Sequence, residues 1–336
     1  MLMLSNDDLF VLLQCRRPIH GSSQLTAANY RARADFGNGL FQDVKLDVID
    51  YLMVPRERFC SNASYVVFLL ISVEDAGARY QWRLTYASTT LKRKYNYEVM
   101  FVIGKPRSPR LQRLLYIENE LHGDMLLLDV YDVYRNLTLK TLAAFRYIVS
   151  NCKDIKTIIK MDDDVGWNIE KTTELSKKIM DTNSIHCHVA VNATVHRSPS
   201  DKWVVTVDEW NHKVFPDYCC GMVYAVPFHA ARKMLSVVRR QKFLWLEDVF
   251  LTGVLREVAG VGVDIGLVEI CVHHLDDEEC HRTRAETDRA RVLAKVKCPV
   301  CDDVIITHKE LAKHCLQVHP EDGVESRPQD YSAIKE

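Results

Sequence analysis

An alternation of apolar runs and helical patterns between residues 65 and 161 constrains the fold of this chain more than any other feature. Apolar runs of strand length cover residues 66–71, 98–104, 124–129 and 155–161. Between them, apolar residues recur at helical spacing among charged residues, as in residues 109–121. Four successive β-α steps predict a mostly parallel sheet with helices on both faces. We therefore expect an α/β fold.

The second half of the chain is less regular. Residues 189–193 and 203–207 have strand character, and residues 228–240 have a helical pattern. A segment bounded by Pro and Gly, residues 215–221, is predicted to be a loop. Residues 1–58 are weakly periodic, and no regular element is predicted there.

The last apolar run of the alternating region ends in three carboxylates, Asp162, Asp163 and Asp164. Ligands of open α/β sheets lie beyond the carboxyl ends of the strands, and the triplet stands at such an end. Adjacent carboxylates repel one another, and Mg²⁺ or Mn²⁺ removes that repulsion while also binding substrate phosphates. The triplet therefore predicts a metal–diphosphate site, with an acidic surface turn as the alternative.

A second acidic pair, Glu247 and Asp248, lies within an apolar segment, residues 243–253. The pair has two interpretations. At the start of a helix, the two carboxylates would cap its positive end. In a partly desolvated pocket, they would suit a general base that takes a proton from an attacking hydroxyl.

Composition restricts the class of protein. With 336 residues, the chain suits one large α/β domain and a small appendage. Forty-four basic and 45 acidic residues give a net charge of −1, so bulk charge favours neither nucleic acid nor a membrane surface as a partner. No membrane-spanning run is visible in the sequence. Eleven cysteines and three N-x-S/T sequons, at Asn62, Asn136 and Asn192, mildly favour a secretory-pathway lumen. The disulfide pairing stays open.

Several short motifs occur in a specific order across roughly residues 60–275. They are Arg79-x-x-x-Arg83-x-Thr85, Asp124, Asp132-x-Tyr134-x-Asn136-Leu137-Thr138-x-Lys140, Lys160-Met161-Asp162-Asp163-Asp164-Val165, Lys202-Trp203, Pro216-x-Tyr218-x-x-Gly221 and Glu247-Asp248-Val249. Together they resemble the β-1,3-galactosyltransferase family of inverting hexosyltransferases. The resemblance implies a GT-A fold, a nucleotide-binding α/β sandwich that uses a UDP-sugar donor and Mn²⁺ or Mg²⁺.

The resemblance also implies a metal site. Asp162, Asp163 and Asp164 correspond to the family's metal and UDP motif, a D-x-D pattern, and Asp164 is the expected direct ligand. A later histidine can complete the metal site in this family. His273 or His274 is the candidate here.

Two pairs of residues in this chain correspond to the family's remaining site residues. Asp248 corresponds to the general base, with Glu247 beside it, and Arg79 and Arg83 fall where basic residues lie near the nucleotide. The implied reaction moves galactose or N-acetylhexosamine from a UDP-sugar to a hydroxyl of a glycan acceptor, on glycoprotein or glycolipid, through a β-1,3 bond. The family is anchored in the Golgi membrane, although no anchor is visible in this sequence.

The chain departs from the family pattern at two places. Residues 85–87 read Thr-Tyr-Ala instead of Thr-Trp-Gly, and Cys219-Cys220-Gly221-Met222-Val223 replaces a loop with a Ser and several glycines. Met222 and Val223 are expected to narrow the acceptor pocket, which affects the choice of acceptor and not the type of reaction.

The tail has the ligand spacing of a C₂H₂ zinc finger. Cys298, Cys301, His314 and His319 predict a ββα unit around a tetrahedral Zn²⁺, with chance spacing or disulfide pairing as the alternative. Such fingers usually work in the cytosol or nucleus, which conflicts with a Golgi lumen. Few basic residues flank this finger, so a structural or protein-partner role is favoured over nucleic-acid recognition.

The sequence thus predicts five segments. A lead-in of residues 1–58 precedes the transferase domain, residues 59–275. A charged linker (276–297), the finger (298–320) and a disordered tail (321–336) follow. Two other functions stay open. One is a catalytically inactive relative that acts as a binding protein. The other is a zinc-finger nucleic-acid- or protein-binding module with a vestigial transferase domain.

Overall fold

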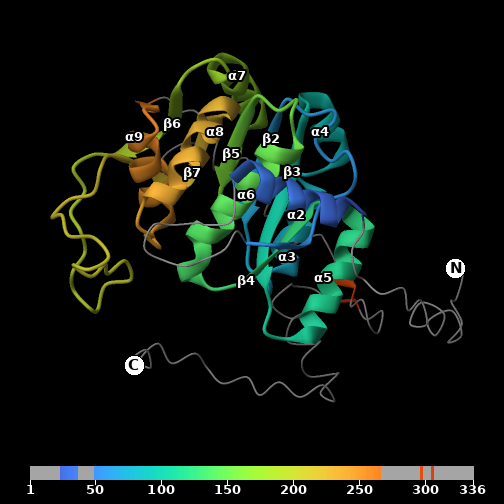
Figure 1. Ribbon diagram of the computed structural model, residues 1–336. Helices are drawn as coiled ribbons and strands as arrows, with labels where there is room; N and C mark the ends of the chain where they lie inside the picture. The colour runs from blue at the N-terminus through green and yellow to red at the C-terminus, as the bar shows by residue number, and fades with distance from the viewer. Residues whose placement is uncertain (1–22, 37–48, 266–295, 298–303, 306–336) are drawn as a thin grey trace, which may run out of the picture.

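The computed structural model of the chain describes residues 23–36, 49–265, 296–297 and 304–305. Its centre is an eight-stranded sheet with the strand order β1-β4-β3-β2-β5-β7-β6-β8 (Figure 1). The strands are β1 Tyr51–Met53, β2 Tyr65–Leu70, β3 Tyr97–Lys105, β4 Met125–Tyr131, β5 Thr157–Met161, β6 Ser184–Ala190, β7 Tyr218–Pro227 and β8 Gly262–Ile265. Strands β4, β3, β2 and β5 pair in parallel, as do β6 and β8, whereas β1 and β7 run antiparallel to their neighbours. The predicted mostly parallel α/β fold is confirmed.

Helices connect the strands and cover both faces of the sheet. They are α2 Ser23–Phe36, α3 Ala76–Leu84, α4 Thr89–Tyr95, α5 Pro109–His122, η1 Tyr134–Asn136, α6 Leu137–Asn151, α7 Ile169–Ile179, α8 Phe228–Val237, η2 Val238–Arg240, the π-helix η3 Val249–Leu255 and α9 Arg256–Val258. Helix α6 packs against both α2 and α8 on the near face in Figure 1. Within the described ranges, no helix has both the length and the apolar character needed to cross a bilayer.

Side chains of β2 show how both faces of the sheet are filled. Phe68 packs edge-on against Phe145 of α6, with ring centroids 5.4 Å apart. Tyr65, three residues earlier, points to the opposite face because side chains alternate along a strand. There it stacks on Tyr97, which contacts Trp167. An unbroken apolar strand is the pattern expected when helices and loops bury both faces.

The region before residue 59 adds a helix and a strand that the sequence does not predict. Ala28 and Ala32 of α2 are buried, and α2 packs on α6. The side chain of Asn29 donates to the carbonyl of Tyr51 (3.0 Å) and accepts from its N–H (2.8 Å), which joins α2 to β1. These two elements therefore pack on the same sheet domain.

The second half differs from the sequence expectation at three places. Residues 203–207 form turns and irregular backbone, not a strand, in an arm, residues 191–217, that projects from the body in yellow (Figure 1). The expected strand at 189–193 is instead β6, which ends at Ala190, and β7 begins at Tyr218, inside the predicted loop. The predicted helix at 228–240 is confirmed as α8 and η2.

Two disulfides close the described domain. Cys60 pairs with Cys152, and Cys187 of β6 pairs with Cys219 of β7. Each joins residues that are far apart in the chain, by 92 and 32 positions. Cross-links of this kind form and persist in oxidising compartments.

Candidate active site

A cleft of about 890 Å³ opens at the carboxyl ends of β2 and β5. One wall is the loop that follows β2, through Ile71, Ser72 and Asp75. The other walls come from the ends of β5 and β7, from the residues that lead into η3, and from the arm. The volume suits a small-molecule ligand, and the position is the one at which α/β sheets bind ligands.

The acidic triplet follows β5 directly into this cleft. The N–H of Asp162 donates to the carbonyl of Met222 (2.9 Å), and the indole of Trp82 donates to the carbonyl of Asp163 (2.9 Å). Asp162 and Asp163 line the cleft, whereas Asp164 is exposed and does not line it. Burial and the charge of Asp164 raise the pKa of Asp163 to about 6. This donor set fits a hard divalent cation, which would remove the repulsion between the carboxylates.

A buried lysine joins the two acidic sites. The Lys160 ammonium donates to Asp162 Oδ1 and to the carbonyl of Gly221. Burial opposes the charge of Lys160, but the nearby carboxylates of Asp162 and Glu247 outweigh it and raise the lysine pKa. Lys160 therefore stays protonated and offsets negative charge between the triplet and the second acidic pair.

The second acidic pair lies where the chain enters η3. Asp248 Oδ1 accepts a hydrogen bond from the N–H of Val249 (2.8 Å), so this carboxylate caps the helix, as one interpretation of the sequence predicts. A Cβ at Gly221 would lie 3.2 Å from Asp248 Oδ2, so a glycine leaves room for the second oxygen. Glu247 accepts from the Tyr224 hydroxyl (2.5 Å). Burial raises the pKa of both acids, that of Glu247 to about 7.

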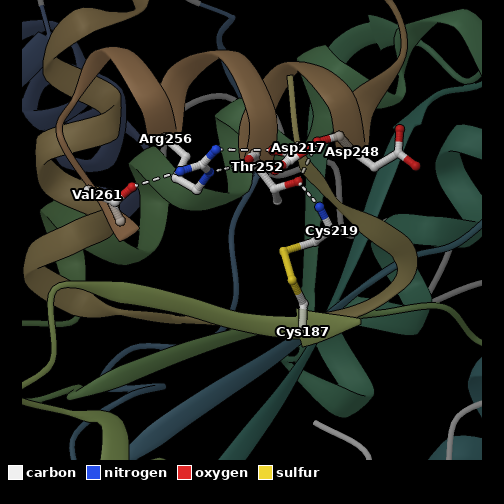
Figure 2. The surroundings of a disulfide bond; sticks show 7 residues. All are labelled: Cys187, Asp217, Cys219, Asp248, Thr252, Arg256 and Val261. Carbon is white, nitrogen blue, oxygen red and sulfur yellow. Dashed lines mark hydrogen bonds between the residues drawn. A yellow bond between two sulfur atoms is a disulfide. The ribbon is translucent and has the colours of Figure 1, made fainter. Parts of the chain in front are cut away.

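Figure 2 shows how the backbone of Asp248 is held. The Thr252 hydroxyl donates to the Asp248 carbonyl (2.6 Å) and accepts from the N–H of Cys219 (2.8 Å). Cys219 is tied to β6 through its disulfide with Cys187, and Arg256 donates to the Thr252 carbonyl (2.7 Å). In this view the Asp248 carboxylate points away from that network. The backbone of the candidate base is thus fixed by contacts that leave its carboxylate on the cleft side.

The loop after β2 is held by a buried ion pair. The N–H of Val73 donates to Asp132 Oδ2 (2.6 Å), and the Lys140 ammonium donates to Asp132 Oδ1 (2.7 Å) and to the carbonyl of Ile71 (3.1 Å). The Lys140 and Asp132 side chains are only 2% and 8% exposed. Asp132 and Lys140 thereby fix the backbone of this cleft wall on both sides of Ser72.

A model of the galactosyltransferase family matches residues 77–265, which is more than half of the chain. The chain belongs to the galactosyltransferase family. It is 26% identical over 204 residues to human beta-1,3-galactosyltransferase 5, and the match covers 60% of this chain and 66% of that protein. It is 28% identical over 240 residues to human UDP-GalNAc:beta-1,3-N-acetylgalactosaminyltransferase 1, and the match covers 68% of each protein. The chain thus spans about two thirds of the length of these relatives.

Solved structures show more distant likenesses. The apo structure of the WbbM bifunctional glycosyltransferase aligns with a TM-score of 0.37 and 14% identity, over 64% of this chain and 40% of that one. The mannosyltransferase PcManGT from Pyrobaculum calidifontis, in complex with GDP-Man and Mn²⁺, aligns with a TM-score of 0.38 and 13% identity, over 90% of this chain and 87% of that one. The membership of the galactosyltransferase family comes from the sequence match.

The two arginines of this galactosyltransferase-family chain lie outside the cleft lining. Arg79 makes a bidentate ion pair with Glu118 (2.8 Å for each contact) and donates to the carbonyl of Ser72 (3.0 Å). Arg83 pairs with Asp124 (2.7 and 2.8 Å) and with Glu118 (2.7 Å). Acidic side chains of the domain thus pair with both guanidinium groups, and the expected position of the two arginines near a nucleotide stays a prediction. Arg79 acts on the cleft through the loop that it holds.

The departures from the family pattern fall in different surroundings. Tyr86 packs with Trp82 and Trp167, at ring-centroid distances of 5.0 and 5.6 Å, in an aromatic cluster beneath the sheet. Met222 lines the cleft, whereas Val223 is buried in β7 and does not. Of these departures, Met222 is thus the one that contributes to the lining of the cleft.

Lys140 and Lys160 are site residues to which sequence reasoning gave no role. Their signal was present, because each places a charge inside a largely apolar, buried element, although α6 also contains the buried Arg146. The remaining predicted ligands, His273, His274, Cys298, Cys301, His314 and His319, lie outside the described residues. Among the residues that the structure describes, no three His, Cys, Asp or Glu side chains converge as a metal site.

Proposed function

We propose that the chain is an inverting glycosyltransferase that moves galactose or N-acetylhexosamine from a UDP-sugar to a glycan hydroxyl through a β-1,3 bond. The observation that carries this proposal is the arrangement of two acidic sites in one cleft. Asp162 and Asp163 follow β5, Asp248 caps η3, and Lys160 lies between them. A donor diphosphate and an acceptor hydroxyl need two such sites side by side.

The two acids of the second site take different roles because their surroundings differ. Glu247 is buried, its pKa is raised to about 7, and it accepts from Tyr224. The pKa of Asp248 is also raised, but the Val249 N–H and the Lys160 charge favour its ionised form. Asp248 is therefore the base, and Glu247 supports it.

In the reaction, Asp248 takes the proton of the acceptor hydroxyl as the hydroxyl oxygen attacks the anomeric carbon of the donor sugar. The bond from that carbon to the diphosphate breaks, and UDP leaves with the electron pair. Attack from the face opposite UDP inverts the anomeric centre. Asp162, Asp163 and Asp164 would hold a divalent cation, Mn²⁺ or Mg²⁺, which neutralises charge on the departing diphosphate.

Release of UDP by the purified full chain tests this function. UDP-galactose, UDP-N-acetylgalactosamine and UDP-N-acetylglucosamine are offered with a panel of glycans and Mn²⁺. We expect acceptor-dependent UDP release with one donor, loss of release on chelation and recovery on adding Mn²⁺. Turnover that survives full chelation, or survives Asp164→Ala together with Asp162→Ala, contradicts the metal assignment. Absence of both turnover and Mn²⁺-dependent UDP binding favours a catalytically inactive binding protein.

We propose a secretory-pathway lumen, such as the Golgi, as the compartment of the domain. Two disulfides support this proposal, and Asn62 and Asn192 of the sequons are exposed. Expression in eukaryotic cells followed by endoglycosidase treatment tests it. We expect a mobility shift that Asn62→Gln and Asn192→Gln reduce. A protein without glycans and with all thiols reduced contradicts the proposal.

We also propose that Cys298, Cys301, His314 and His319 bind one Zn²⁺, on the strength of their spacing in the sequence. Metal analysis of the purified chain tests it directly. One zinc per chain that Cys298→Ser removes is the expected result, and a zinc-free chain contradicts it.

A further inference from the structure

One part of the cleft wall is aromatic and exposed. Tyr134, at the start of η1, and Trp203, in the arm, both line the cleft, with 48% and 46% of each residue exposed. The Trp203 indole N–H donates to the Tyr134 hydroxyl across 3.3 Å, so the arm and the body meet through these two side chains. Tryptophan is usually well buried, and exposed aromatic side chains that gather in a cleft are typical of ligand sites.

The position of Trp203 is fixed before any ligand binds. Its backbone N–H donates to Asp201 Oδ1 (3.0 Å), and Asp201 is paired with His196. The His196 ring packs edge-on against the indole, with centroids 5.8 Å apart. A side chain that is already ordered loses little conformational entropy on binding.

Lys202 adds hydrogen-bond donors beside the aromatic rings. Its ammonium lies 4.8 Å from the centre of the Tyr134 ring and 5.7 Å from that of Trp203. Lys140 and Lys160, the other lysines of the cleft, are neutralised by Asp132 and Asp162. For Lys202, no carboxylate partner is found in the described part of the chain, so its three N–H donors are available to a ligand.

This aromatic wall lies on the side of the candidate base. Tyr134 packs edge-on against Trp245, with centroids 6.2 Å apart, and Trp245 precedes Asp248 by three residues. The acidic end of β5, with Asp162 and Asp163, is another part of the cleft lining. A group bound at the aromatic wall would therefore lie on the side of the candidate base.

We propose that Trp203, Tyr134 and Lys202 form the acceptor subsite. The apolar C–H face of a neutral pyranose ring lies on the Trp203 indole, and its hydroxyls accept from Lys202 and bond to Tyr134. This inference rests on the proposed function, because it assigns the wall to the acceptor and not to the donor.

Steady-state transfer with varied acceptor tests the subsite. Trp203→Ala is expected to raise the acceptor KM at least tenfold, Trp203→Phe is expected to raise it less, and Lys202→Met is expected to raise it several-fold. Val207→Ala is the matched control, because Val207 is 64% exposed on the same arm and does not line the cleft. UDP affinity in the presence of Mn²⁺, measured by calorimetry, should change less than twofold in all of these variants.

A second measurement keeps the subsite testable without turnover. Saturation-transfer NMR follows methyl β-galactopyranoside and methyl N-acetyl-β-glucosaminide bound to the full chain with UDP and Mn²⁺. We expect the strongest signals on one face of one of these rings, and their loss in Trp203→Ala but not in Val207→Ala.

The outcomes separate this inference from the proposed function. If the wild-type chain transfers sugar and Trp203→Ala keeps the wild-type acceptor KM, the subsite is wrong and the function stands. A fall in UDP affinity that matches the rise in acceptor KM also overturns the subsite, because it assigns the wall to the donor. If the wild-type chain neither binds nor turns over UDP-sugars, the function fails, and the NMR comparison still decides whether Trp203 binds a pyranoside.

Discussion

The N–H of Val73 donates a hydrogen bond to Asp132 Oδ2 across 2.6 Å, and this contact ties the first wall of the cleft to an ion pair buried beneath it. Lys140 completes the arrangement by donating to Asp132 and to the carbonyl of Ile71. Asp132 and Lys140 thus hold the loop after β2, which is distant from them in the sequence and contacts them only in the folded domain.

Breaking this ion pair should cost stability and donor affinity together. Lys140→Met leaves the Asp132 carboxylate buried without its partner, and the expected loss is about 3–5 kcal/mol in the free energy of unfolding. The double variant Asp132→Asn with Lys140→Met should lose less than the sum of the single losses. Urea unfolding measures the stabilities, and calorimetry measures UDP affinity, which should fall in each variant. Additive losses with unchanged UDP affinity contradict this role.

Replacing Arg83 tests whether this arginine stabilises the fold or binds the nucleotide. Arg83→Met breaks ion pairs with Asp124 and Glu118 whose side chains are 8% and 18% exposed, so a loss of about 3 kcal/mol in unfolding free energy is expected. Under conditions in which the variant is folded, UDP affinity should change less than about threefold. Arg56→Met is the control, because the Arg56 side chain is 46% exposed and its pair with Glu98 contributes about 0–1 kcal/mol. A large loss of UDP affinity without loss of stability would place Arg83 at the nucleotide instead.

The proton on Glu247 makes stability depend on pH. The pKa of folded Glu247 is raised from 4.5 to about 7, mainly by burial. Between these two pH values the folded protein binds more protons than the unfolded chain, so the free energy of unfolding falls as pH rises through this window. Glu247→Gln does not ionise and lacks that fall. Relative to the wild type, it should therefore gain about 3 kcal/mol between pH 4 and pH 8.

Urea unfolding of both proteins across that range, in metal-free buffer, measures the difference. A constant difference between wild type and Glu247→Gln at all pH values contradicts the raised pKa.

A methyl group at Gly221 should displace the candidate base. The added Cβ would lie 3.2 Å from Asp248 Oδ2, which is closer than nine in ten real Cβ contacts. Gly221→Ala is therefore expected to lower kcat about tenfold, because small displacements of a catalytic group are costly, while UDP affinity is kept. Wild-type kcat in this variant would show that the position of the Asp248 carboxylate is not critical.

The strands β2 to β5 and the helix α5 could be predicted because each is a strongly patterned segment whose burial agrees with its local preference, whereas the short helix α4 was not predicted. The arm could not be predicted either. Trp203–Val207 has the composition of a strand, but it pairs with no strand in the described part of the chain, and turns and irregular backbone form instead. The first residues of β7, from Tyr218 to Gly221, were hidden by a Pro and a Gly that also suit a loop.

The acidic residues of the site were predictable because carboxylates that directly follow an apolar strand or lie within an apolar segment indicate a structural or functional requirement. The ion pairs of Arg79 and Arg83 were not predictable, because sequence alone does not show that Glu118, 39 positions beyond Arg79, pairs with its guanidinium group. For the same reason the pairing of Cys187 with Cys219 becomes visible only when β6 and β7 lie side by side.

The most direct test of the account is the turnover of Asp248→Asn with its donor site intact. This substitution keeps the shape of the side chain and removes the base, so kcat should fall by about 10²–10⁴-fold while Mn²⁺-dependent UDP affinity stays within about twofold of the wild type. In the wild type, kcat/KM should rise with pH as Asp248 ionises, at a pKa above its usual 3.8 because of burial. Loss of turnover with retained UDP binding is the predicted result. Turnover at the wild-type rate in Asp248→Asn would contradict the account.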